Sequence, residues 1–116
     1  MVDLSKLPEN LIDLNEALTR VGGDEEFFIE LLNDLAELGQ DCLKKLKEAV
    51  NSSDGELLRK TAHSLKGASG NLGAKELQKL AFDLEQNGRD NNFDNSASLI
   101  NKIESEISRL VTFMNS

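Results

Sequence analysis

The chain has 116 residues, of which 39% are hydrophobic, and it carries a net charge of -8. This length supports one compact domain with its own core and is too short for two ordinary domains. The acidic balance argues against nucleic acid as a partner, and no apolar run approaches the roughly 20 residues that cross a membrane. One histidine and one cysteine, Cys42, permit no internal disulfide and too few soft ligands for zinc, so we expect a cytoplasmic domain without membrane contact or its own metal.

Helix-forming residues dominate the sequence, which has no Trp or Tyr and a single Pro. A short helix is predicted at about residues 13–21, and Gly22 and Gly23 would end it. Asp24 would then cap a long second helix. Apolar residues recur in this helix every three or four positions and should face a core: Phe28, Leu31, Leu35, Leu38, Cys42, Leu46 and Ala49.

The segment NSSDGELL interrupts the second helix, and Ser53 followed by Glu56 matches a capping box that opens a third helix ending at Gly73. The segment AKELQKLAFDLEQNG predicts a fourth helix, and RDNNFDNS predicts a polar turn. A last helix follows on the stripe Leu99, Ile100, Ile103, Ile107, Leu110 and Met114. We therefore predict an all-α fold in which the whole chain, 1–116, forms one domain. It would be an antiparallel up-and-down four-helix bundle over about residues 24–114, with the short N-terminal helix as a lid.

The third helix carries the only histidine, His63, in the stretch TAHSLKGASGNLGA. At about 100° per residue, the apolar stripe of this helix centres roughly 60° from Leu57, whereas His63 lies at roughly 240° and should point to solvent. That side also carries two glycines and two cations, namely Gly67, Gly70, Arg59 and Lys66. Glycine in a helix interior is unfavourable by roughly 0.5–1 kcal/mol relative to alanine, so we interpret both glycines as clearance for an approaching macromolecule.

The charge of the protein is unevenly spread along the chain. Between Arg59 and Lys79, five Lys or Arg residues stand against one acid, a net charge of +4, which leaves -12 for the remainder. The histidine segment is therefore a basic island on an acidic protein, and it offers a place for an anion.

The reactivity of His63 depends on which ring nitrogen holds the proton. A neutral imidazole is a nucleophile through its free nitrogen, and a hydrogen-bond acceptor can hold the proton on the other nitrogen. Glu85 lies at the edge of the fourth helix's apolar stripe, roughly 80° from Leu77, from where it could reach the histidine helix. From geometry alone, an orienting carboxylate and an ordinary solvated acid are equally open readings of Glu85.

The stretch AHSLKGASGNLGAKELQKLAFDLE, residues 62–85, resembles the histidine-containing phosphotransfer (HPt) domain, most of all the HPt domains of bacterial hybrid sensor histidine kinases. The shared pattern is a His, then Leu-Lys-Gly, Gly-Ala, Leu and a closing Leu-Glu, all in register. The segment DLNEALTRVGGDEEFFIELL resembles the usual lead-in, so the similarity spans most of the chain. It implies a phosphocarrier of a two-component phosphorelay, without an ATP site of its own, rather than an enzyme.

The resemblance also implies roles for individual residues. His63 would be the phosphoacceptor, modified on the ring nitrogen far from the backbone, and Lys66 would neutralise the phosphoryl oxygens. Gly67 would give the partner clearance. Glu85 occupies the place of a Gln or Glu that accepts a proton from the other ring nitrogen, and Arg59 is basic as in several family members.

The implied partners are response-regulator receiver domains and a hybrid sensor kinase. An aspartate of one receiver would give the phosphoryl group to His63, and an aspartate of another would take it. The Mg²⁺ ion and the acidic pocket would belong to the receiver, so no cofactor is expected here, and we expect a monomer. Two alternatives remain open: the N-terminal phosphoacceptor module of a chemotaxis-type histidine kinase, and a helical interaction bundle without phosphotransfer. The joint presence of His63, Lys66, Gly67 and Glu85 argues against the second.

Overall fold

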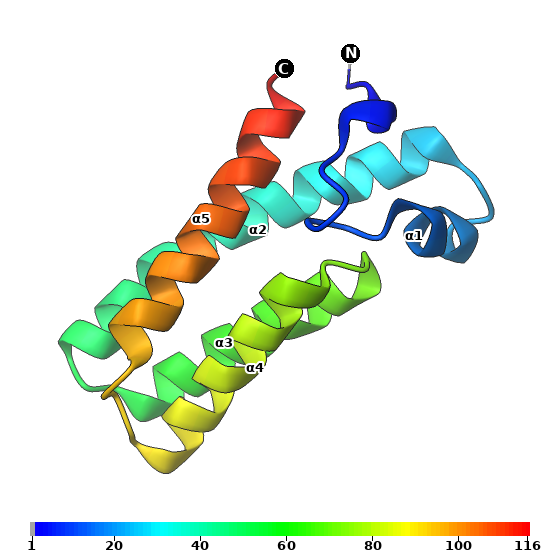
Figure 1. Cartoon of the computed structure of the whole chain (residues 1–116). Helices are drawn as coiled ribbons and strands as arrows, with labels where there is room; N and C mark the ends of the chain where they lie inside the picture. The colour runs from blue at the N-terminus through cyan, green and yellow to red at the C-terminus, as the bar shows by residue number, and fades with distance from the viewer. Residues whose placement is uncertain (1) are drawn as a thin grey trace.

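The computed structural model describes residues 2–116, and the described chain is all-helical (Figure 1). Its elements are a 3-10 turn, η1 (Leu4–Lys6), and five α-helices: α1 (Leu14–Arg20), α2 (Glu25–Asn51), α3 (Gly55–Asn71), α4 (Lys75–Asp90) and α5 (Ser96–Met114). At 1.5 Å per residue, the 27 residues of α2 extend about 40 Å, close to the 41 Å long axis of the molecule. No helix in the described part of the chain is long and apolar enough to cross a membrane.

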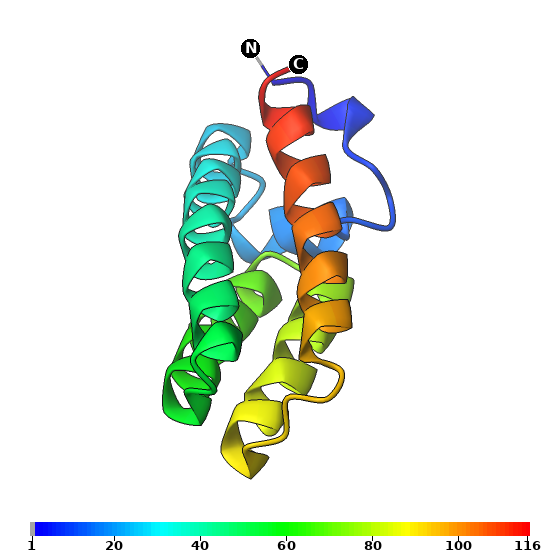
Figure 2. The same ribbon diagram turned by 90° about the vertical axis from the view of Figure 1, so that its left-hand side faces the viewer.

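The four long helices form the predicted up-and-down bundle. Helix α2 packs against α3 and α5, and α4 packs against the same two helices, so each helix has two neighbours. Figures 1 and 2 show α3 and α4 running side by side, with α5 crossing α2 on the other side of the bundle. The core between them is almost entirely aliphatic, and its largest fully buried side chains include Phe28, Leu32, Leu46, Leu58, Leu65, Leu84, Ile103, Ile107 and Leu110.

The predicted helix ends are mostly confirmed. Asp13 and Asp24 cap α1 and α2 through their side chains, and Gly22 and Gly23, both at positive φ, separate the two helices. Gly73 follows α3 at a φ of 71°. This left-handed backbone conformation is readily accessible to glycine and ends the helix as predicted.

The predicted capping box at the start of α3 is wrong. Asp54, not Ser53, is the N-cap, and its carboxylate accepts a hydrogen bond from the amide of Leu57 at 3.0 Å. Ser53 instead adopts a φ of 52° in the turn that precedes the cap. Aspartate and serine are about equally good caps, so local sequence alone did not separate two adjacent candidates.

The predicted apolar stripes are correct in period and slightly rotated from the observed buried faces. Leu31 and Leu38 of α2, and Leu57 of α3, are only partly buried at the edges of their stripes, whereas Leu32 and Leu58 are fully buried.

The end of α4 and the start of α5 differ from the predicted boundaries. The turn before α5 is shorter than predicted, because α4 continues to Asp90 and α5 begins at Ser96. Near the C-terminus, Phe113 is buried and Met114 is only half-buried.

The segment before α1 is part of the core, which the sequence pattern did not indicate. Its buried side chains are Leu4, Leu7, Leu11 and Ile12. The amide of Asp13 donates to the carbonyl of Gly73 at 3.2 Å, and Arg109 of α5 donates to the side chain of Asn10. This segment therefore joins the α3–α4 turn to α5 at the end of the bundle where α5 terminates (Figure 2).

Candidate functional site

His63 and Glu85 meet across the α3–α4 contact. The Nδ1 atom of His63 lies 2.8 Å from Oε2 of Glu85. The histidine side chain is 63% exposed, whereas that of Glu85 is only 3% exposed. Because an ionised carboxylate only accepts hydrogen bonds, Nδ1 must carry the ring proton and donate a hydrogen bond to Glu85. This leaves the lone pair of Nε2 free, on the ring edge away from Glu85.

Two cations accompany the carboxylate of Glu85. The Nζ atom of Lys66 lies 2.7 Å from Oε1, and a guanidinium nitrogen of Arg89 lies 3.6 Å from Oε2. The lysine contact is a short ion pair whose direction does not satisfy hydrogen-bond geometry. Lys66 comes from α3 and Arg89 from α4, so both helices supply charge to the same buried acid.

The pKa of Glu85 reflects these neighbours. Burial alone raises the pKa of this carboxyl, but the interactions with Lys66 and then His63 outweigh it and hold the pKa below the ordinary value of 4.5. Glu85 is therefore a carboxylate at neutral pH. It is a negative charge that accepts a hydrogen bond from the imidazole and would stabilise positive charge on the ring.

Gly67 lies on the exposed face of α3, one turn after His63. A Cβ atom added to Gly67 would meet nothing within 4 Å, so the surface beside the imidazole is open. The similar prediction for Gly70 is wrong. A Cβ atom there would lie 2.5 Å from Nε2 of Gln78, so Gly70 provides a close approach between α3 and α4 rather than an open surface.

Arg59 is not directed at the imidazole. Its guanidinium forms an ion pair with Glu56, one turn earlier on α3, at 2.6 and 3.0 Å. Lys75 likewise pairs with Glu16 at 3.2 Å, near α1. The basic island is therefore less positive than its residue count predicts, because acids from outside the segment pair with several of its cations.

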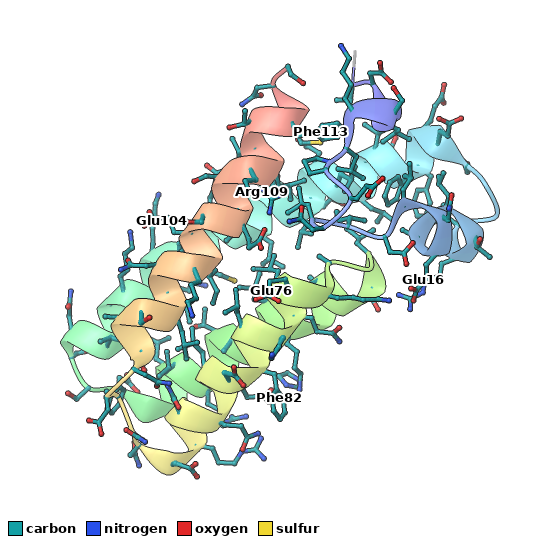
Figure 3. The ribbon with its side chains drawn as sticks, in the orientation of Figure 1. Glu16, Glu76, Phe82, Glu104, Arg109 and Phe113 are labelled. Carbon is teal, nitrogen blue, oxygen red and sulfur yellow. The ribbon has the colours of Figure 1, made fainter. Side chains whose placement is uncertain are left out.

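Two residues beside the site were missed by the sequence analysis. Arg89 follows Glu85 by four positions and Phe82 precedes it by three, spacings that place both near Glu85 on one helix face. Phe82 is 46% exposed, and the Nζ atom of Lys66 lies 5.7 Å from the centre of its ring. Figure 3 shows Phe82 on the side of α4 away from α5. Helical spacing from Glu85 was a signal that could have identified both.

The site is an open surface and not a ligand cleft. Clefts of about 510 and 410 Å³ lie beside the N-terminal segment, and neither is lined by His63. Within residues 2–116, no group of three or more His, Cys, Asp and Glu side chains is arranged to hold a metal ion. An exposed nucleophilic imidazole with a fixed tautomer suits the transfer of a group to or from another macromolecule.

Comparisons with known proteins agree with this chemistry. The model of the Hpt domain family matches residues 30–113, which include His63, Lys66, Gly67 and Glu85. The chain is also similar to the crystal structure of histidine-containing phosphotransfer protein B (HptB) from Pseudomonas aeruginosa PAO1. The two are 28% identical with a TM-score of 0.80, over 89% of this chain and 90% of the other. No curated protein matches the sequence significantly. The chain belongs to the Hpt domain family, the phosphocarrier domains of phosphorelays that interact with receiver domains.

Proposed function

We propose that His63 carries the phosphoryl group: it accepts the group on Nε2 from an aspartyl phosphate of one receiver domain and passes it to an aspartate of another. The observation that carries this proposal is the pairing of an exposed imidazole with a buried carboxylate at 2.8 Å. A surface histidine without a function needs no such partner, and a buried carboxylate is unfavourable unless it is paired.

In the first step, the Nε2 lone pair attacks the phosphorus atom. A nitrogen–phosphorus bond forms, the bond from phosphorus to the aspartyl oxygen breaks, and its electron pair returns to the aspartate carboxylate. The Nδ1 proton stays on the ring, which becomes positively charged, and Glu85 stabilises this charge from 2.8 Å. Transfer to the second receiver reverses these changes, so no proton has to enter or leave the site.

The surrounding residues support the same step. Lys66 lies on the same helix one turn from His63, with its side chain 27% exposed, so its ammonium is available to phosphoryl oxygens arriving at Nε2. Gly67 leaves space for the receiver loops beside the ring. Arg59 has no direct part in this step, since its guanidinium is paired with Glu56.

The experiment uses two phosphodonors. Purified protein is incubated with phosphoramidate, a small donor, and with receiver domains from the source genome that have been phosphorylated with acetyl phosphate. Mass mapping should place an acid-labile, alkali-stable phosphoryl group on His63 in both cases. The labelled protein should then phosphorylate at least one unmodified receiver.

Two variants complete this test. His63→Gln should take no label from either donor, while Ser64→Ala, which removes the neighbouring exposed hydroxyl, should be labelled like wild type. Label on another residue, or transfer that survives in His63→Gln, would contradict the assignment. Labelling by phosphoramidate without transfer from any receiver would instead favour a bundle that has lost its phosphorelay partners.

A further inference from the structure

Helices α3 and α4 touch through their backbones at Gly88. Gly88 is buried in α4, and a Cβ atom added to it would lie 2.5 Å from the amide nitrogen of Arg59 and 2.6 Å from the carbonyl oxygen of Gly55. Cβ atoms in proteins essentially never approach heavy atoms outside their own residue and its chain neighbours closer than 3.0 Å. Both contacted atoms belong to the backbone of α3, which cannot rotate away as a side chain would.

This backbone contact lies one helical turn from the site on both helices. Gly88 follows Glu85 by three positions, and Arg59 precedes His63 by four. Three residues correspond to a rise of about 4.5 Å, so the contact and the hydrogen-bonded pair are adjacent levels of the same helix pair. The spacing of α3 and α4 at Gly88 therefore governs the gap that His63 and Glu85 must close.

A small change in the α3–α4 spacing is enough to affect the hydrogen bond between His63 and Glu85. Ordinary carbon contacts occur at about 3.5–4.0 Å, so a Cβ atom at Gly88 would push the two backbones apart locally by about 1 Å. The bond from His63 Nδ1 to Glu85 Oε2 is 2.8 Å, and hydrogen bonds of this kind extend only to about 3.2 Å. A displacement of this size is enough to break it.

Gly70 shows that not every close contact in this helix pair has the same effect. It lies seven residues after His63, and its hypothetical Cβ would meet the amide end of Gln78, an exposed and flexible side chain that can move aside. The obstacle at Gly88 is backbone, whereas the obstacle at Gly70 is a movable side chain. The two glycines therefore form a matched pair for an experiment.

We propose that Gly88 is a positioning residue for phosphotransfer: its backbone contact with Gly55 and Arg59 sets the α3–α4 spacing that holds His63 in the Nδ1-protonated tautomer against Glu85. The tautomer part of this inference stands by itself, and its consequence for rate rests on the proposed function. Gly88 is buried, so a receiver does not touch it, and its effect must pass through the geometry of the site.

The experiment compares Gly88→Ala with Gly70→Ala. Nitrogen-15 NMR of the His63 ring reports the tautomer, circular dichroism reports the fold, and phosphoramidate and phospho-receiver labelling report the chemistry. In Gly88→Ala, we expect a helical protein whose ring shifts move from the Nδ1-protonated form toward a mixture of tautomers. Both labelling rates should fall together by about 10- to 100-fold, because a displacement of about 1 Å can slow a reaction about 100-fold. Gly70→Ala should keep the wild-type tautomer.

If Gly88→Ala does not fold, a milder variant replaces it. Gly55→Ala places a Cβ 2.8 Å from the Gly88 carbonyl, and the added change Asn91→Gly removes the asparagine side chain that it would otherwise strike. Asn91 has a φ of 51°, so glycine fits there, and Asn91→Gly alone is the control. A folded variant, Gly88→Ala or this double variant, with wild-type ring shifts would overturn the inference. Absence of phosphoramidate labelling in wild type would instead refute the proposed function and leave the tautomer result intact.

Discussion

The α3–α4 pair and the α2–α5 pair occupy equivalent places in the bundle but are built differently. Between α3 and α4, glycines lie at the contacts, and the pair carries the buried Glu85 with its histidine and cations. Between α2 and α5, aliphatic side chains fill the space, and the one glycine, Gly39, lies against the buried side chain of Ile107 rather than against a backbone. In the α2–α5 pair, large side chains fill the interface and stabilise it. In the α3–α4 pair, glycines allow the two helices to approach each other closely.

Ion pairs follow the same division. Lys47 of α2 and Glu104 of α5 form a bridge at 3.0 Å with both side chains nearly half exposed. Lys66 and Glu85 form one at 2.7 Å in which the carboxylate is almost fully buried. An exposed pair contributes little to stability, because solvent screens it, whereas a buried carboxylate depends on its partners. We therefore expect the charges between α2 and α5 to have small effects on stability, and the charges between α3 and α4 to affect phosphotransfer.

The largest expected effect tests the α2–α5 pair. Ile107→Ala removes a fully buried side chain from α5 and should lower the free energy of unfolding by about 2–5 kcal/mol, measured by urea denaturation. The folded variant should transfer phosphate at the wild-type rate, because Ile107 lies on α5, which packs against α2 and α4, whereas His63 lies on α3. A transfer defect in fully folded Ile107→Ala would show that the two helix pairs are coupled and would break the comparison.

The second prediction concerns the open surface of α3. Gly67→Gln should melt at the same or a higher temperature than wild type, because Gly67 is exposed and contacts nothing that a side chain would displace. Its transfer from a phospho-receiver should be about 100-fold slower, because the side chain would stand where receiver loops approach Nε2. Labelling by phosphoramidate, which needs no such space, should be nearly unchanged. Equal losses with both donors would indicate a distorted helix.

A third experiment compares one lysine from each pair. Lys66→Ala should slow receiver transfer by about 10-fold or shorten the phosphohistidine lifetime by a similar factor, because a partly exposed charge-assisted contact contributes about 1.5 kcal/mol. Lys47→Ala removes a lysine of similar kind from α2–α5 and should leave both quantities unchanged, with a stability change below about 1 kcal/mol. Indistinguishable kinetics in the two variants would remove Lys66 from the site.

The smallest expected effect is a difference in pH dependence. The pKa of Glu85 is lower in the folded chain than its ordinary value of 4.5, so below about pH 5 the unfolded chain binds the proton more readily than the folded one. The stability that Glu85 contributes is thus present above pH 4.5 and is lost as the pH falls through its folded pKa. Urea unfolding between pH 7 and 3 should show a steeper acid-side decline in wild type than in Glu85→Gln. Parallel curves would mean that folding does not perturb this carboxyl.

Much of the fold and of the site could be predicted from the sequence. The apolar periodicity of α2 to α5 and the breaks at Gly22, Gly23 and Gly73 predicted the bundle, since these signals are local and repeat over long helices. The solvent-facing position of His63 was confirmed, because opposite faces of one helix follow directly from residue spacing. From helix geometry alone, Glu85 was equally consistent with an orienting carboxylate and with a solvated surface acid. The resemblance to the HPt domain favoured the orienting carboxylate.

Other features could not be predicted because they depend on contacts between segments distant in the chain. The burial of Leu4, Leu7, Leu11 and Ile12 requires the N-terminal segment to cross to α5, and no local pattern reports that. The wrong interpretation of Gly70 has the same origin, since its neighbour Gln78 belongs to another helix. Arg59 was placed on the correct side of α3, but its ion pair with Glu56 was not foreseen.

By itself, the sequence determined which residues form helices, which face of α3 meets solvent, and that His63 lies on that face with Lys66 and Gly67 beside it as the candidate site. These properties are set by the helical repeat and by the chemistry of individual side chains. Only the tertiary structure decided that Glu85 is buried 2.8 Å from His63 and that Gly88 permits the backbone contact one turn away. A hydrogen bond is lost when its two atoms move apart by a few tenths of an ångström. Distances between helices are set by packing rather than by the sequence pattern of either helix alone.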